Sequence, residues 1–264
     1  MNERAVIYLL RDPSCRSPEA LGRLLRFELA PRILCMDSVS RLQIDVADER
    51  ADVKTPSLKD PRERALVALV KLKLSALEDR HAIERLLRDA ELVLEGYLVN
   101  ESPYKEYGEN AHSLPRDWPD GLRSPGIVAI TCLPRPARIP YEEWMRRWHG
   151  RMSPVSEAIQ PRTRYMRNVV VEALTEGAPE LGGIVEEAYP SKEHVENRYL
   201  FFGAKGPLQL TKNMLDIFRA VSSFVNVAKL RTTMMSEYFI LSEGAPQSSD
   251  GGLESGESEG KIDR

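Results

Sequence analysis

The sequence is poor in cysteine. Its 264 residues include three cysteines, Cys15, Cys35 and Cys132, which are scattered and odd in number. A disulfide-bonded scaffold needs an even set, and a zinc site usually needs closely spaced pairs. The sequence therefore predicts neither a disulfide framework nor a metal site. This cysteine usage is typical of the reducing environment of the cytoplasm, where we expect the protein to be located.

Long apolar runs and a basic excess are also absent. No segment approaches the roughly 18 consecutive apolar residues that a membrane-spanning helix requires. The apolar run near the start ends at Arg11 and Asp12 and is too short for a signal peptide. The net charge is -3 at pH 7, whereas nucleic-acid-binding domains are usually basic. We therefore expect no membrane association and no nucleic-acid partner.

Glycine motifs of common enzyme classes are missing as well. The sequence contains no G-x-G-x-x-G fingerprint, no Walker-type phosphate loop, and no G-x-S-x-G elbow between an expected strand and helix. The nearest stretch, Gly203 to Pro207, is typical of a turn before a helix. These absences disfavour nicotinamide-dependent enzymes and α/β-hydrolases, and we expect no tightly bound cofactor.

The main positive feature is an internal repeat. Each copy begins as a short apolar strand, a loop containing proline and arginine, and a helix whose first turn carries proline and glutamate. A second proline about three turns later predicts that each helix ends or kinks there. Two segments align 123 residues apart, with Ile7 at Ile130, Leu21 at Trp144, Leu25 at Trp148 and Pro31 at Pro154.

The rest of each copy continues the same pattern. Helical spacing predicts one further helix per copy, over 79–90 and 207–225. Tyr97 aligns with Tyr238, 141 residues later, so the second copy carries extra residues. Each copy is thus βαββαβ, the ferredoxin-like order. Apolar or alternating runs predict the remaining strands over 42–49, 64–75 and 91–101 in the first copy, and over 164–174, 182–189 and 233–243 in the second.

These boundaries divide the chain into four parts. The first repeat takes residues 1–108, and the second takes residues 127–242. Between them, 109–126 is rich in proline, glycine, asparagine and aspartate, which predicts a linker. The last part, 243–264, is acidic and rich in glycine and serine, which predicts a disordered tail. The predicted fold class is α+β, with two ferredoxin-like repeats.

The second repeat carries a more specific pattern. Trp144, Trp148 and Pro154 lie on its first helix, and Tyr165 with Asn168 form a Tyr-x-x-Asn strand. This combination resembles the EthD family of the dimeric α+β barrel superfamily, and the resemblance covers most of the second repeat. It implies that the two ferredoxin-like repeats pack face to face as an internal α+β barrel, which is a pseudo-dimer within one chain. Whether two such chains form a homodimer is left open.

One position departs from the EthD pattern. The family histidine falls on Met152, and His149 lies three residues earlier. Residues three apart share nearly the same helix face, so His149 could take over a proton-transfer role. An ordinary imidazole pKa near 6.5 suits acid–base work. His149 is therefore a candidate catalytic residue, with an imidazole satisfied by water at the rim as the alternative.

The same helix is a candidate ligand-binding wall. Trp144, Trp148 and Met152 share one apolar stripe, with Met145 on its flank. The resemblance implies that this helix lines the ligand cavity, and plain packing of the stripe against the sheet is the alternative.

The later strand offers two further candidates. Tyr165 and Asn168 are three residues apart on the strand and should face opposite sides of the sheet. Tyr165 is the better candidate for proton transfer or ligand orientation, because its hydroxyl both donates and accepts hydrogen bonds. Asn168 is a second candidate ligand contact.

The expected function is the binding of a small apolar or aromatic metabolite. The resemblance implies a cofactor-independent catabolic or tailoring enzyme of the oxidoreductase or lyase type. Its reaction would be oxygenation, dehydration or a related elimination, with Tyr165 or His149 moving a proton. Two alternatives stay open: a non-catalytic binding or accessory barrel, because the family histidine is missing, and a haem-binding barrel, because His149 lies beside aromatic residues.

Overall fold

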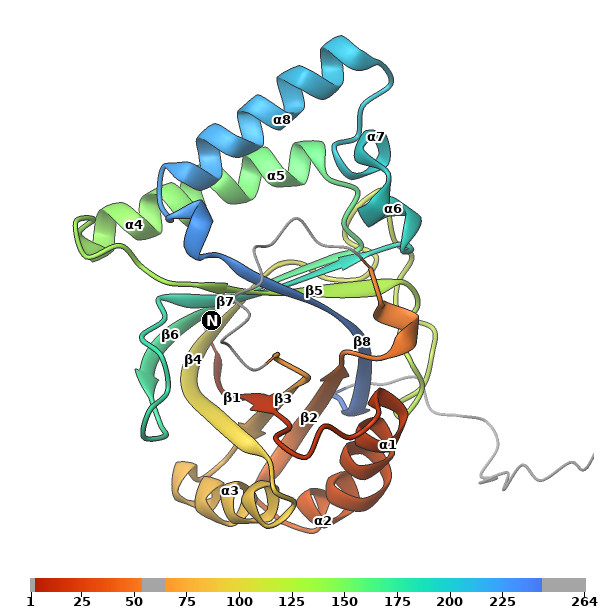
Figure 1. Cartoon of the computed structure of the whole chain (residues 1–264), viewed down its shortest axis with the longest axis vertical. Helices are drawn as coiled ribbons and strands as arrows, with labels where there is room; N and C mark the ends of the chain where they lie inside the picture. The colour runs from red at the N-terminus through yellow and green to blue at the C-terminus, as the bar shows by residue number, and fades with distance from the viewer. Residues whose placement is uncertain (1–2, 54–64, 244–264) are drawn as a thin grey trace, which may run out of the picture.

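Eight antiparallel strands close into a single barrel, with helices stacked on two opposite sides (Figure 1). The computed structural model describes residues 3–53 and 65–243. The expected tail lies outside the described residues except for Glu243. The strands are β1 (Glu3–Arg11), β2 (Val39–Val46), β3 (Ala68–Leu74), β4 (Val93–Lys105), β5 (Ile127–Leu133), β6 (Arg164–Ala173), β7 (Gly183–Tyr189) and β8 (Arg231–Leu241).

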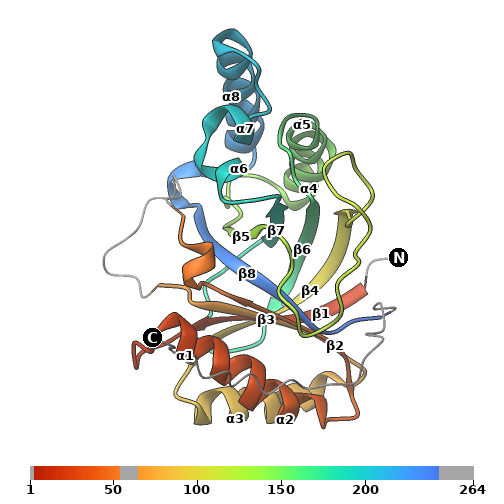
Figure 2. The same cartoon turned by 90° about the vertical axis from the view of Figure 1, so that its right-hand side faces the viewer.

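The helices form two groups, one from each half of the chain. Figure 2 shows α1, α2 and α3 under one side of the barrel and α4, α5 and α8 over the other. None of the helices within the described ranges is long and apolar enough to cross a lipid bilayer. The helices are α1 (Pro18–Arg23), α2 (Ala30–Leu34), α3 (Arg80–Asp89), α4 (Tyr141–Arg147), α5 (Ser153–Ile159), α6 (Glu193–Glu196), α7 (Arg198–Phe201) and α8 (Pro207–Ser222).

The strand order shows how the barrel closes within one chain. The order is β1-β3-β2-β8-β5-β7-β6-β4, so the last strand of each half pairs with the second strand of the other. Within each half the order is fourth, first, third, second. The expectation of an α+β barrel built inside one chain is therefore confirmed, and two strand pairs, β2 with β8 and β4 with β6, join the halves.

Strand alternation gives the barrel two buried faces. Successive side chains point to opposite sides of a strand, so Ile7 and Leu9 of β1 face the barrel interior, whereas Val6, Tyr8 and Leu10 pack under α1 to α3. Burial on both faces explains why β1 reads as a continuous apolar run rather than an alternating one.

The first helix of each half continues past its internal proline. The expectation that the helices end at Pro31 and Pro154 is wrong. A π-helical segment precedes each proline, η1 (Leu24–Leu29) before α2 and η4 (Trp148–Met152) before α5. A proline ring clashes with the carbonyl four residues earlier in an ordinary α-helix. The wider π turn relieves this clash, so each helix runs on.

The alignment of Tyr97 with Tyr238 is also wrong. Ile7 pairs with Tyr97, whereas Ile130, the counterpart of Ile7, pairs with Thr233. Tyr97 packs inside the barrel, but Tyr238 faces outward, where the Arg26 guanidinium lies 3.7 Å from its ring centroid. A shift of an odd number of residues moves a side chain to the other face of a strand. Tyr97 and Tyr238 are therefore not at equivalent positions, although both are tyrosines at the end of a repeat.

One end of the barrel interior is filled by charged side chains. Lys71 Nζ lies 2.8 Å from a Glu101 oxygen and 2.6 Å from a Glu186 oxygen. Arg164 lies 3.3 Å from Glu186 and 3.0 Å from Glu237. All five side chains are at most 4% exposed. Buried charges are tolerated when they pair in this way, and each of these five side chains has at least one partner of opposite charge inside the barrel.

The segment between β4 and β5, expected as the linker, lies against this charged end. The Tyr107 hydroxyl donates to Glu237 over 2.8 Å, and Glu106 forms an ion pair with Arg164 at 2.7 Å. Farther along, Arg123 donates to the Ser236 hydroxyl over 2.7 Å. These contacts attach the segment to β6 and β8 and cover the charged layer.

Asp45 gives the charged layer a pH dependence. It lies directly opposite Glu237 on the neighbouring strand and is fully buried. Burial, followed by the negative charges of Glu237 and Glu186, raises the pKa of Asp45 well above its ordinary value. A carboxyl with a raised pKa in the folded state stabilises the fold while protonated, and this contribution is lost as the pH rises through that pKa.

We therefore expect Asp45→Asn, which cannot ionise, to gain stability relative to the natural protein as the pH rises. The gain should reach on the order of 1 kcal/mol at pH 8 and shrink at pH 4, as measured by urea unfolding. Asp37→Asn, at an exposed position, controls for the loss of one charge. A difference that is the same at both pH values would contradict a protonated Asp45.

Candidate functional site

The candidate site lies between the helix formed by α4, η4 and α5 and the outer face of β4 and β6. Strand alternation sends Tyr165 and Val169 of β6 toward the helix, where they pack with the tryptophans. Asn168 faces the opposite way and donates to a Glu186 oxygen over 2.8 Å inside the barrel. The sheet thus separates Asn168 from the other candidate residues, as the strand spacing predicts.

The two tryptophans fill the space between helix and sheet. Trp144 and Trp148 are 0% and 1% exposed, and Trp148 stacks on Phe224 with the ring centroids 6.4 Å apart. Their rings lie on the backbone at Gly182 and Gly183, where a Cβ atom would come within 3.0 Å and 2.5 Å of them. Both glycines are therefore needed so that the rings can approach the strand.

Tyr165 links Trp148 to the hydroxyl of Ser153 at the edge of this cluster. Its hydroxyl accepts a hydrogen bond from Trp148 Nε1 at 3.3 Å and lies 3.4 Å from Ser153 Oγ. The Arg162 guanidinium lies 3.9 Å from the Tyr165 ring centroid. Burial is the main cause that raises the pKa of Tyr165. The hydroxyl is therefore neutral at ordinary pH and available for hydrogen bonding.

Arg167 is a buried cation whose contacts are neutral. Its side chain donates to Ser153 Oγ at 3.3 Å and to Ser102 Oγ at 3.0 Å, and its guanidinium lies 4.8 Å from the Tyr104 ring centroid. Arg167 is 9% exposed, and burial lowers its pKa. Within residues 3–53 and 65–243 it forms no ion pair with a carboxylate. Buried charges normally have a counter-ion, so this site favours an anion.

His149 lies in the π-helical segment η4, close to Arg167. Its ring meets the edge of Trp148 at a centroid distance of 4.7 Å. Its Nε2 atom is buried and has no hydrogen-bond partner among the described residues. Burial, followed by the positive charge of Arg167, lowers the pKa of His149 to about 4. The imidazole is therefore neutral near pH 7 and able to accept a proton.

The methionines complete the apolar part of the site. Met145 and Met152 are partly buried and pack against the same aromatic cluster. The structure thus brings six of the seven candidate residues together, and Asn168 alone lies on the other side of the sheet. Methionine side chains adapt to ligands of varied shape and make favourable contacts with aromatic rings.

Sequence reasoning missed the charged part of the site. Arg167 follows Tyr165 by two residues, so strand alternation alone places both on the helix side. Ser102 and Tyr104 come from the other half of the chain, and only the pairing of β4 with β6 places Ser102 opposite Arg167. No local sequence signal indicates that pairing.

Two kinds of cofactor site can be compared with the residues present, a metal cluster and a haem beside His149. Among them, no group of three or more histidine, cysteine, aspartate and glutamate side chains could hold a metal ion. A porphyrin needs a broad apolar slot beside its axial histidine, but the indole rings beside His149 already fill the space down to the backbone of β7. The residues present around His149 therefore do not fit haem.

Comparison with known proteins supports the fold. No protein-family model matches the chain, and no curated protein matches its sequence. Among solved structures, an anthrone oxidase-like protein has a TM-score of 0.55 and 12% identity, covering 94% of this chain and 98% of that chain. A proposed monooxygenase from Fusobacterium nucleatum has a TM-score of 0.49 and 8% identity, covering 90% of this chain and 93% of its own.

A proposed chlorite dismutase is also similar. It has a TM-score of 0.45 and 8% identity, covering 90% of this chain and 95% of that chain. The similarity to the anthrone oxidase-like protein shows that the chain shares the fold of that protein.

The packing of the indoles on the strand can be tested at Gly183. We expect Gly183→Ala to lower the free energy of unfolding by roughly 1–3 kcal/mol, because the added methyl group overpacks against Trp148. Gly150→Ala is the matched control, since a Cβ atom there meets nothing within 4 Å and alanine favours helix by about 0.5–1 kcal/mol. Urea unfolding measures both. Equal stability of the two variants would show that Trp148 does not pack on Gly183.

Proposed function

We propose that this protein is a cofactor-independent enzyme of the EthD type that removes a proton from a small aromatic or apolar metabolite. The observation that carries this proposal is Arg167, a buried cation whose described partners are all neutral. A substrate that becomes an anion supplies the missing counter-charge at the step where its proton leaves.

In this proposal His149 is the general base. Its neutral imidazole has a buried nitrogen without a hydrogen-bond partner among the described residues. A base must be unprotonated before the reaction and close to the group that stabilises the product anion. His149 meets the first condition because burial and then the positive charge of Arg167 lower its pKa to about 4. It meets the second because it lies one helical turn before Ser153, whose hydroxyl accepts a hydrogen bond from Arg167.

The other residues bind and position the substrate. The ring of Tyr104 and the partly buried thioethers of Met145 and Met152 suit an aromatic ring. Tyr165 acts as a positioning residue, since its hydroxyl lies 3.4 Å from Ser153 Oγ, which in turn accepts from Arg167. Because the indoles fill the space between helix and sheet, we place the substrate on the flank that carries His149.

The proposed reaction class follows from the role of His149 as a base that removes a proton. Dehydration and cofactor-independent oxygenation can both begin with removal of a proton from carbon. In an oxygenation, the resulting carbanion passes electrons to O2, a C–O bond forms, and the CH2 group becomes a carbonyl with loss of water. The fold neighbour described as anthrone oxidase-like makes anthrone, which has such an acidic CH2 group, a suitable first probe.

The finer fold assignment belongs to the same proposal. We propose that the chain is a tandem of two EthD-like, ferredoxin-like units. Two features support this. Each half has its strands in the order fourth, first, third, second, and each first helix has a π-helical segment directly before α2 or α5.

The catalytic proposal predicts that the natural protein speeds O2 uptake by anthrone above the rate in buffer. His149→Gln should lower this rate by about 10²–10⁴-fold, the usual contribution of a general base. An oxygen electrode measures the rate, and His112→Gln, at an exposed histidine, is the matched control. If anthrone and related phenols bind without being consumed, the protein is instead a non-catalytic binding barrel.

The pH dependence gives an independent test. We expect the activity to stay constant from pH 8 to about pH 5 and to fall as the pH drops toward 4, because only the neutral imidazole accepts a proton. Arg167→Gln should raise the pKa of His149, since it removes the nearby positive charge, as followed by NMR titration of the imidazole. If the pKa of His149 is unchanged in Arg167→Gln, the charge of Arg167 does not act on His149, and the proposal that the two residues form one site is contradicted.

A further inference from the structure

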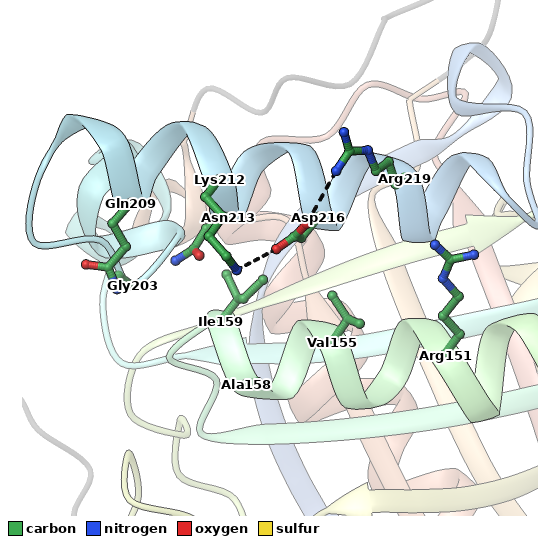
Figure 3. Close-up of a pocket in the computed structure, with 10 residues that line it drawn as sticks. All are labelled: Arg151, Val155, Ala158, Ile159, Gly203, Gln209, Lys212, Asn213, Asp216 and Arg219. Carbon is green, nitrogen blue, oxygen red and sulfur yellow. Dashed lines mark hydrogen bonds and ion pairs between the residues drawn. The ribbon is translucent and has the colours of Figure 1, made fainter.

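A second concave surface lies on the other flank of the same helix. It is a groove of about 480 Å³ between α5 and α8, a size in the range of small-molecule sites. Figure 3 shows the residues that line it. None of the candidate residues discussed above belongs to the lining, so the groove is separate from the site around His149 and Arg167.

The α5 side of the groove is amphipathic along its length. Arg151, Val155, Ala158 and Ile159 line it, and their spacing places them on one helix face. With a rise of about 1.5 Å per residue, the stretch from Arg151 to Ile159 spans about 12 Å. The apolar part of this stretch, from Val155 to Ile159, takes about 6 Å of that length. The groove therefore has a cationic end followed by a short apolar wall.

The α8 side adds positive charge at the same end. Arg219 and Lys212 both line the groove and share one carboxylate, Asp216, at 3.8 Å and 2.8 Å. Arg151 forms no ion pair with any residue that the structure describes. Figure 3 shows the Arg151 and Arg219 side chains at the same end of the groove. Lys212 lies farther along the groove, close to Ile159 (Figure 3). Arg151 and Arg219, beside the one carboxylate that Arg219 shares with Lys212, leave this end with an excess of positive charge.

The opposite end is held in place by the loop before α8. Asn213 donates to the Phe202 carbonyl over 2.7 Å, and the amide N–H of Lys205 donates to Gln209 over 3.0 Å. Gly203 has a φ of +53°, and a Cβ atom there would lie 2.4 Å from the Ile159 carbonyl oxygen. The loop therefore sits directly on the end of α5, and the groove is formed before any ligand binds.

We infer that the groove between α5 and α8 binds an organic carboxylate with an extended apolar body. The carboxylate lies between Arg151 and Arg219, where it relieves the repulsion between two like charges. The apolar body lies along Val155 and Ile159 toward Gly203. This site is independent of the proposed chemistry at His149.

Decanoate is a suitable probe, with 1-decanol and acetate as probes that keep only the apolar body or only the charge. We expect calorimetry at low salt to show binding of decanoate to the natural protein, weaker binding of 1-decanol, and no measurable binding of acetate. Arg151→Gln and Arg219→Gln should each weaken decanoate binding about three- to tenfold, the range for a partly exposed ion pair. Added salt should weaken it further.

Two variants locate the bound decanoate. Arg146→Gln removes a charge from the same helix outside the groove, at a side chain that is 72% exposed, and should leave the affinity unchanged. Arg167→Gln should also leave it unchanged. The inference is overturned if decanoate does not bind, if 1-decanol binds as tightly, or if Arg167→Gln rather than Arg151→Gln weakens the binding.

Discussion

The pairing of β4 with β6 is the contact on which the candidate site depends. It joins the two halves of the chain and places Ser102 opposite Arg167 and Glu101 opposite Asn168. One side of this seam faces the helix and gives Arg167 its hydroxyl partner. The other side faces the barrel interior and joins Glu101 to the charged layer. A single register therefore sets both the outer site and the inner network, and a slip by one residue would exchange the two.

The π-helical segments are the second constraint. A π turn takes one residue more than an α turn, so it rotates everything beyond it around the helix axis. In η4 this extra residue falls at Trp148 to Met152, where Trp148 turns into the core while His149 lies against its edge. The proline that follows is tolerated for the same reason. The local geometry that admits Pro154 thus also brings an imidazole to the edge of the aromatic cluster.

Much of this architecture could be predicted from periodicity. The strands and the opposite faces of Tyr165 and Asn168 follow from apolar runs and from the two-residue period of a strand. The pairing of the strands into an α+β barrel was expected from the internal repeat together with the resemblance to the EthD family. The helices around Pro31 and Pro154 could not be predicted, because a π turn has no simple sequence signature. The charged interior could not be predicted either. Lys71 lies within an apolar run, and a strand that is buried on both faces gives no alternation to show which side is polar.

Only part of the candidate site could be predicted from the sequence, for a related reason. The residues that were predicted all lie on one helix and one strand, where local spacing decides which side chains meet. Ser102 and its partner Arg167 are 65 residues apart in the sequence. Tyr104 comes from the same strand as Ser102. Their contribution depends on the long-range register of the barrel. Contacts of that kind are set by closure of the whole sheet and not by any local pattern.

The buried cations of this protein differ in whether carboxylates lie beside them. Lys71 and Arg164 lie inside the barrel and each meets two carboxylates, so their charges are neutralised within the fold. Arg167 is on the same strand as Arg164 but on the opposite face, and its described partners are hydroxyls and an aromatic ring. An uncompensated buried charge costs stability. Such a cost is retained where the missing counter-ion arrives with a ligand, which is why Arg167, more than the tryptophans, supports the proposal that this face of the barrel is the functional one.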